Sequence, residues 1–359
     1  MNRVTKYLLI TIVSISLSYS QSLQDNLESM AKANAQGYLG PMVTAFGMGI
    51  NSGTYHNAKP HKLLGFDLKL SVSSTTVSDE SKTFDFILPA PFTIPITINS
   101  NNVDIERDID INPDELYNSD RTSSTPFGPK TINKITADPV VARNNIANQL
   151  ALVLPGNLSA DQVKDTFEDE INEFISALDT IPTVPGFDLP YVPLAIPQIS
   201  LGLPKDIELT LRGIPATDLG DLGKLTFFGF GGKIGLNQFI PLPNIILPRF
   251  AVGYYMTNLE VGDIMEMKNS ITTLQVSKSF PVLTVYGGFG FESSSLDVDY
   301  TYTDEITDTE IPVKFSLDGD NKFRTTMGAR IKLAIISINV DYNIGEFNAV
   351  NFGAGLTFR

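Results

Sequence analysis

The fold is decided by the segment Val350-Asn-Phe-Gly-Ala-Gly-Leu-Thr-Phe-Arg359. Its apolar residues alternate with Asn, Gly, Thr and Arg, which is the period-two pattern of an amphipathic strand. A strand at the edge of a sheet needs a second neighbour, and a closed barrel provides one by pairing the last strand with the first. The segment therefore predicts a β-barrel that closes at this strand. The alternative is the edge strand of a secreted β-sandwich.

The same segment has a characteristic order of residue types, with polar Asn351, then Gly353, apolar Leu356 and aromatic Phe358. This order resembles the C-terminal assembly signal of outer-membrane β-barrels. It departs from the signal at Arg359, which leaves the aromatic residue second from the end. The resemblance implies insertion by the barrel-assembly machinery, with outer-membrane lipid around the barrel.

The N-terminal residues read as an export signal. Arg3 and Lys6 precede an apolar run at 7–17, and Ser18-Tyr-Ser20 supplies small residues for cleavage. We therefore expect a Sec-type signal peptide at 1–20, cleaved near Ser20. The apolar run is shorter than the roughly 20 residues that a membrane-spanning helix needs.

Composition narrows the class of protein. The chain has 359 residues and no Cys, so we expect neither disulfides nor thiolate chemistry, and stability must come from burial or sheet closure. The formal charge of -14 argues against a nucleic-acid partner, because phosphates attract a basic surface. A mean hydropathy of +0.04 suits a barrel with an apolar outside and a polar inside.

Alternation of apolar and polar residues continues through most of 207–358. We expect eight strands there and two more at 42–50 and 63–75. The fold class is thus all-β, a transmembrane antiparallel barrel of about 10–14 strands, since the irregular region 76–138 has room for more. Several segments reach the roughly 9–11 residues that a tilted membrane-spanning strand requires.

The connections alternate in length. If the C-terminus is periplasmic, the short turns near Pro281 and Ala334 lie in the periplasm, and the longer loops 262–268 and 304–321 lie outside. The connection 240–248 is the exception, since it is long and expected in the periplasm. These features assign 21–359 to one outer-membrane barrel domain.

Two parts of the domain are not expected to be barrel wall. Residues 21–37 predict an N-terminal helix, ended by Gly37, which is either a packed cap or a plug. Residues 138–204 predict a helical and Pro-rich insert, with helices beginning at Pro139 and after Ser159. The stretch 181–204 reads as an extended, polyproline-like connection.

Charged residues on the polar strand faces are the candidate solute-contacting residues of the lumen. One interpretation is that they pair with one another and stiffen the barrel. The other makes Arg324, Arg330 and Lys332 an anion-attracting constriction, partly neutralised by Asp341. The full set is Asp67, Lys69, Glu208, Arg212, Lys233, Arg324, Arg330, Lys332 and Asp341.

Metal and catalytic signatures are weak. His56 and His61, which are the 2 histidines of the chain, follow Gly53 in a loop, and we expect them on the surface rather than as ligands. No nucleophile motif accompanies them. We therefore expect no cofactor, no metal site and no enzymatic activity.

Three segments together resemble a functionally uncharacterised family of bacterial outer-membrane barrels, common in the Bacteroidota. They are 37–67, which opens with Gly37-Tyr-Leu-Gly-Pro41, then Leu225-Thr-Phe-Phe-Gly-Phe-Gly-Gly-Lys-Ile-Gly-Leu-Asn-Gln-Phe-Ile-Pro241, and the final strand pair. More distantly, the N-terminal helix and the insert look like those of long-chain fatty-acid transport barrels. These likenesses concern architecture, and a fold does not fix a function.

The leading functional prediction is a barrel that admits or binds a small, partly apolar solute, with the N-terminal helix or the insert obstructing its lumen. The alternative is a non-conducting structural or adhesion barrel whose acidic extracellular loops, such as 304–321, contact a partner. An enzyme within the barrel and a soluble secreted β-protein are further alternatives.

Overall fold

The computed structural model describes residues 21–100, 103–117, 120–154, 157–178, 180–218, 224–240, 247–303 and 310–358. The expected signal peptide, most of the connection 240–248 and residues 304–309 of the acidic loop lie outside these ranges. The chain divides into two compact units. The first comprises Met1–Tyr38 and Thr83–Phe187, and the second comprises Leu39–Lys82 and Asp188–Arg359.

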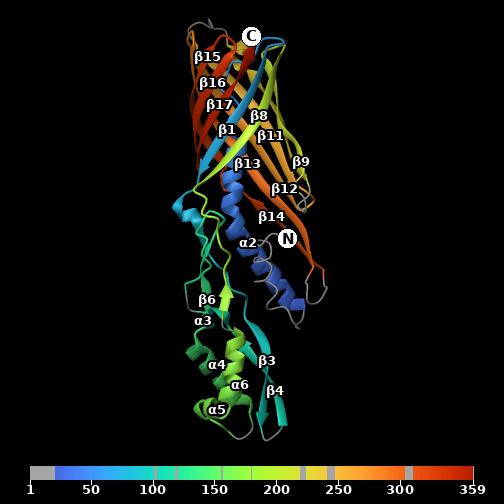
Figure 1. Cartoon of the computed structure of the whole chain (residues 1–359), viewed down its shortest axis with the longest axis vertical. Coiled ribbons are helices and arrows are strands. Elements are labelled where there is room, and N and C mark those ends of the chain that lie inside the picture. The colour runs from blue at the N-terminus through green and yellow to red at the C-terminus, as the bar shows by residue number, and fades with distance from the viewer. Residues whose placement is uncertain are drawn as a thin grey trace. The chain divides into compact units, whose positions relative to one another are not determined.

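The second unit is a closed antiparallel barrel. Among the described residues, 10 strands form a continuous ring in which β12 pairs with β13 and the first strand, β1, pairs with the last, β17 (Figure 1). The predicted all-β antiparallel barrel and its predicted closure at the final strand are confirmed. The ring consists of β1 (Phe66–Thr76), β8 (Tyr191–Leu203), β9 (Ile207–Asp218), β10 (Lys224–Gly235), β11 (Arg249–Val261), β12 (Met265–Ser279), β13 (Leu283–Thr303), β15 (Phe323–Leu333), β16 (Ile336–Ile344) and β17 (Asn348–Phe358).

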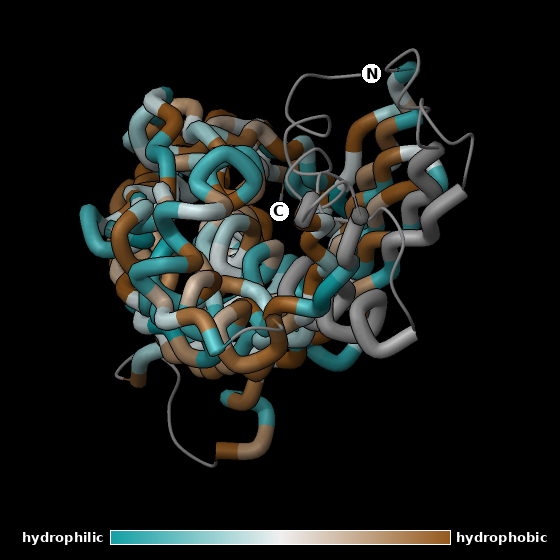
Figure 2. Tube along the Cα trace, turned by 90° about the horizontal axis from the view of Figure 1, so that it is seen from below, coloured by the Kyte–Doolittle hydropathy of each residue, from teal (hydrophilic) through white to brown (hydrophobic). Residues whose placement is uncertain are grey.

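The barrel is apolar outside and polar inside. Along β16 the buried residues are Ser337, Asn339, Asp341 and Asn343, and the apolar residues between them are exposed. Figure 2, seen from below, shows hydrophobic and hydrophilic residues interspersed along the chain. A water-soluble barrel has the opposite arrangement, so this surface suits lipid rather than water.

The N-terminal helix is longer than predicted. Helix α2 spans Gln21–Ile50, so the expected end at Gly37 and the expected strand at 42–50 are both wrong. Packing outweighs the weak helix propensities of Gly37, Gly40 and Pro41. Apolar residues spaced by four, three and four positions lie on one face of the helix and pack against the inner barrel wall; they are Leu39, Val43, Phe46 and Ile50.

The Pro-rich stretch also differs from its prediction. Residues 191–203 form β8, a strand of the barrel wall, instead of a polyproline-like connection. Pro193 and Pro197 are accommodated because they lie where β8 pairs with β1 but not with β9. A strand edge is the position in a sheet at which a missing N–H is tolerated.

Two predicted loops are largely strand. Met265–Lys268 belongs to β12, and β14 (Glu310–Asp318) pairs with the far end of β13 outside the ring. The first part of β12, the far end of β13 and β14 thus extend the sheet beyond the ring, and we call them the β12–β14 extension. Charge pairs support it, since Lys268 lies 3.1 Å from Asp297 and Lys314 lies 2.7 Å from Asp299. At the opposite end the turns near residues 281 and 334 are tight, as expected. A short 3-10 helix, η3 (Leu236–Phe239), follows β10, and another, η1 (Asp79–Lys82), follows β1.

The first unit has its own core. Asp138 accepts a hydrogen bond from the backbone of Val140 at the start of α4, and Ser159 and Gln162 form the predicted capping box of α5. Ile98, Ile146 and further apolar side chains are buried together. Its elements are β2 (Thr83–Asp85), β3 (Phe92–Ser100), β4 (Val103–Ile111), α3 (Pro113–Leu116), β5 (Thr122–Ser124), β6 (Lys134–Thr136), α4 (Pro139–Val153), α5 (Ala160–Thr166), α6 (Glu168–Leu178) and β7 (Thr180–Pro182).

Candidate functional site: the closed lumen

Most predicted lumen charges do point inward. Lys332 is only half-buried, at the end of β15. The other eight are at most 5% exposed, and they are Asp67, Lys69, Glu208, Arg212, Lys233, Arg324, Arg330 and Asp341. The lumen they face is occupied by the chain itself, because the end of α2 and the linker 51–65 lie within the ring of strands.

Cations of the wall hold the end of α2. Arg212 donates to the carbonyl oxygens of Ile50 and Ser52 at 2.6 and 2.8 Å, and Arg324 donates to that of Met48 at 2.9 Å. The last carbonyls of a helix lack partners within the helix and carry partial negative charge, so cations stabilise this end. The two guanidinium groups therefore form a cap supplied by β9 and β15.

A carboxylate completes this cap. Glu292 of β13 lies 2.7 Å from Arg324 and accepts a hydrogen bond from Asn51 at 3.0 Å. Lys69 of β1 donates to the carbonyl oxygen of Gly53 at 2.7 Å. Gly53 has a φ of 67°, a left-handed conformation that glycine adopts without strain, and there the chain turns away from the helix.

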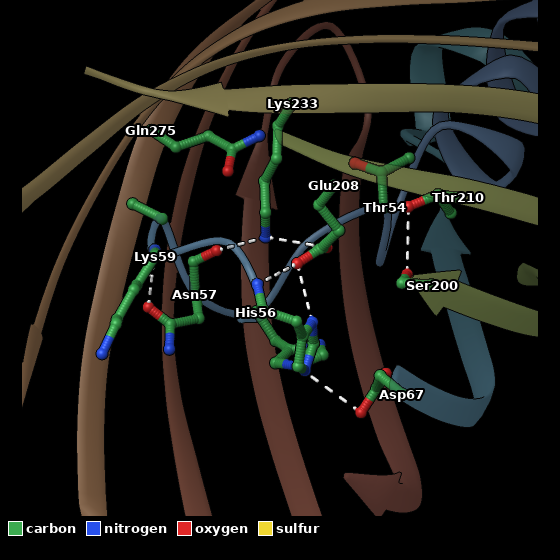
Figure 3. A network of polar contacts seen from close by, with 12 residues as sticks. Thr54, His56, Asn57, Lys59, Asp67, Ser200, Glu208, Thr210, Lys233 and Gln275 are labelled. Carbon is green, nitrogen blue, oxygen red and sulfur yellow. Dashed lines mark hydrogen bonds and ion pairs between the residues drawn. The ribbon is translucent and has the colours of Figure 1, made fainter. Parts of the chain in front are cut away.

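The linker carries both histidines into the lumen. His61 Nδ1 lies 2.7 Å from Glu208, which also pairs with Lys233 at 3.1 Å, and Lys233 donates to the carbonyl of Asn57 (Figure 3). His56 Nε2 lies 3.9 Å from Asp67. The prediction of surface histidines is wrong, because it rested on a strand before Gly53 where the structure has a helix inside the barrel.

A third polar network joins β13, β16 and β17. Asp341 accepts hydrogen bonds at 2.8 Å from Tyr286, Asn343 and Asn351. Asn351, a residue of the expected assembly signal, in turn accepts from Ser71 of β1 at 2.6 Å. The network thus ties the closing pair of strands together from inside.

Arg324, Arg330 and Lys332 do not line one open constriction. Arg324 is engaged at the helix end, whereas Arg330 donates to Thr357 at 2.7 Å, and Thr357 donates to Asp67. Of the assembly-signal residues, Gly353 faces inward, where a Cβ would collide with Asn339. Leu356 and Phe358 are exposed on the outer face, and Phe358 stacks on Phe66 across the closing pair.

An apolar inner wall adjoins the polar lumen, and sequence reasoning missed it. Inward residues of β8, β10 and the β12–β14 extension contact the helix face that begins at Leu39. The signal for it was the helical spacing of the four apolar residues of α2. The buried wall residues are Ile196, Phe227, Met267, Leu296 and Leu317.

The sequence matches the model of a family described as "Family of unknown function (DUF6588)" over residues 1–358. The chain belongs to this family. No curated protein matches it.

Buried polar atoms without a protein partner remain in the lumen of this DUF6588 barrel. They include both side-chain polar atoms of Asn269 and the side-chain oxygens of Gln198 and Gln275. Such atoms are costly unless they bind water or a ligand. The barrel wall therefore retains hydrogen-bonding groups that the end of α2 and the linker 51–65 do not use.

Two further features concern the described part of the DUF6588 chain. No helix there has the length and apolar composition to cross a membrane. Within the same residues, no three His, Asp or Glu side chains gather as metal ligands would.

Proposed function

We propose that this protein is an outer-membrane barrel that is closed at rest by residues 39–65 and that admits or binds a small, partly apolar solute when this plug moves. One observation carries the proposal: a single segment of chain covers both an apolar inner wall and a polar, charged lumen. A solute with apolar and polar parts matches both surfaces. The proposal involves no catalytic step and no cofactor.

The outer surface supports a location in lipid. The outward residues of β16 are apolar from Ile336 to Ile344, which is close to the roughly 9–11 residues of a membrane-spanning strand. On β13 the outward side chains are apolar up to Phe291 and polar from Ser293 onward. The band of outward apolar side chains, here called the apolar belt, therefore ends while β13 continues. This is expected for a barrel that extends beyond the membrane. The expected signal peptide and assembly signal agree with this location, and lipid and the assembly machinery are its proposed partners.

The plug has the properties of a closed gate. Its apolar contacts are with neutral side chains, and its polar end is held by a few wall cations, chiefly Arg212 and Arg324. Removing those cations takes away the charged hydrogen-bond donors of the helix carbonyls and should favour displacement of the segment.

Reconstitution in planar bilayers tests the gate. We expect low conductance for the natural protein and frequent openings for the double variant Arg212→Met/Arg324→Met, which keeps the side-chain length and removes the charge. Lys268→Met is the matched control, because Lys268 is half-exposed on the outer face. Uptake of the uncharged dye phenylnaphthylamine by Gram-negative cells expressing each variant should follow the same order.

The second candidate is a non-conducting structural or adhesion barrel. It is favoured by the pairing of the lumen charges with one another and with the plug. Silence of every variant in conductance, together with dye uptake no higher than in cells lacking the protein, would reject the uptake proposal. Loss of cell-surface adhesion on deletion of 304–321, with the barrel intact, would then support the second candidate.

A further inference from the structure

The barrel wall is incompletely paired at one place. Strands β8 and β9 pair only between Gln198–Leu203 and Ile207–Arg212. Yet β8 continues along β1 to Tyr191, and β9 continues along β10 to Asp218. Residues 191–197 and 213–218 therefore border a seam in which neither strand has a ladder partner on the facing side.

The sequence keeps this seam from closing. Among the ten described barrel strands, proline occurs only in β8 and β9, and only in their unpaired lengths. Pro193, Pro197 and Pro215 have no N–H to donate to a facing strand, so a complete ladder cannot form there. Gaps in pairing are otherwise costly in a membrane, where backbone groups lack water. A seam with three prolines is therefore a built feature.

The inner side of the seam is apolar. Ile196 is buried in the apolar inner wall, and Leu194 and Ile214 pack against it. Leu194 also lies against the end of α2, because a Cβ on Gly49 would come 2.7 Å from its Cδ1. The seam thus adjoins the lumen at the point where the plug helix ends.

The outer side of the seam meets the apolar outer face at one end only, because Pro193 and Tyr191 pair with the polar residues Ser74 and Thr76. Ala195 pairs with Val72, which in turn pairs with Phe352, and Val72 and Phe352 are exposed on the outer face. At its end near Ala195, the seam therefore connects the apolar inner wall with the surface that we assign to lipid.

We propose that this seam is a lateral portal through which an uncharged, apolar part of a solute passes between the lumen and the membrane. The proposal rests on the proposed function, to which it adds a route and a substrate class. Passage through a wall of apolar side chains excludes an ionised group, whose desolvation there is costly. Movement of Gly49 away from Leu194 would open the route from inside.

A reversible cross-link across the seam tests the portal. The chain has no Cys, so Ala195→Cys with Ala216→Cys introduces the only two thiols, which a bis-maleimide with a cleavable disulfide linker can bridge. The control pair is Leu201→Cys with Leu209→Cys, which are register partners where the ladder is already closed. Heat-dependent gel mobility verifies that each variant folds.

Cross-linking the seam should slow phenylnaphthylamine uptake by roughly ten-fold, a barrier higher by about 1.4 kcal/mol, and reduction of the linker should restore it. The control cross-link should have no effect. Replacing Pro193, Pro197 and Pro215 together with Val should also slow uptake, because it restores the missing donors.

Undiminished uptake through the cross-linked seam would overturn the portal and leave the proposed function standing, with an axial route through the lumen. Dye uptake no higher than in cells lacking the protein, in every variant, would overturn the proposed function and the portal with it. Slowed uptake in both the seam and control pairs would also count against the portal, since it would show a general loss of mobility.

Discussion

Single buried charges hold the plug, and the cost of removing one follows from its partners. Arg324 is 1% exposed and pairs with Glu292 and the end of α2. Arg324→Met leaves Glu292 buried without its cation, so we expect the free energy of unfolding to fall by about 3–5 kcal/mol. Urea unfolding in detergent micelles measures this change. Lys268→Met, which removes a half-exposed cation, should cost no more than about 1 kcal/mol, and equal losses would contradict the assignment.

Neighbouring residues of the closing strand should respond oppositely to the same substitution. Gly353→Val places a side chain against Asn339 inside the barrel, so we expect a marked fall in the folded fraction. Ala354→Val places a valine on the exposed outer face instead and should be tolerated. The heat-modifiable fraction on gels measures both. Equal yields of folded protein would show that the inner face at residue 353 does not limit closure.

For single residues, the sequence predicts whether a side chain points into the lumen, but not which groups it contacts there. The inward positions of Asp67, Glu208 and Asp341 follow from strand period alone and were predictable. Their contacts were not, because one partner of Glu208, His61, comes from a linker that has no regular period. The lumen histidines were missed for the same reason.

Helix α2 is the element on which gating depends. Val43→Asn puts an amide into the apolar contact, so we expect the cost of displacing the helix to fall by about 1.5–3 kcal/mol. A single thiol at Ser52→Cys, which is otherwise 1% exposed, should then react with maleimide roughly ten-fold faster or more. Gln36→Asn, at an exposed helix position, should leave the rate unchanged. An unchanged rate in Val43→Asn would mean that the helix does not move.

Helices and strands were predictable where the two faces of the element have different surroundings, one apolar and one polar. The strands β9 to β13 and β15 to β17 follow from alternation, and the helices α4 and α5 of the first unit follow from their caps. Residues 42–50 were misassigned because a helix inside a lumen is buried on several sides. It therefore lacks the polar face that marks a helix in sequence. Strand β8 was missed because closely spaced prolines usually indicate a connection, whereas here they lie along an unpaired strand edge.

For the whole molecule, we expect the properties of a membrane-inserted barrel. Unheated protein should migrate faster on gels than heated protein and should sediment with outer-membrane fragments, because a closed ladder resists detergent. Deleting 348–358 removes β17 and the pairing with β1, so this variant should lose both properties. Natural protein recovered in the soluble periplasmic fraction would contradict the membrane assignment and favour a secreted β-protein.

The path of α2 and its linker has a consequence for the order of assembly. Thr44 contacts Asp320 at the end of the barrel that carries β14, whereas His61 contacts Glu208 near the opposite end, where β1 begins and β17 finishes. The chain thus enters the ring of strands at one end and leaves it at the other. A ring that formed first would have to be threaded by everything that precedes residue 39. We therefore expect the strands to close around a helix that is already in place, which makes the pairing of β1 with β17 a late event in biogenesis.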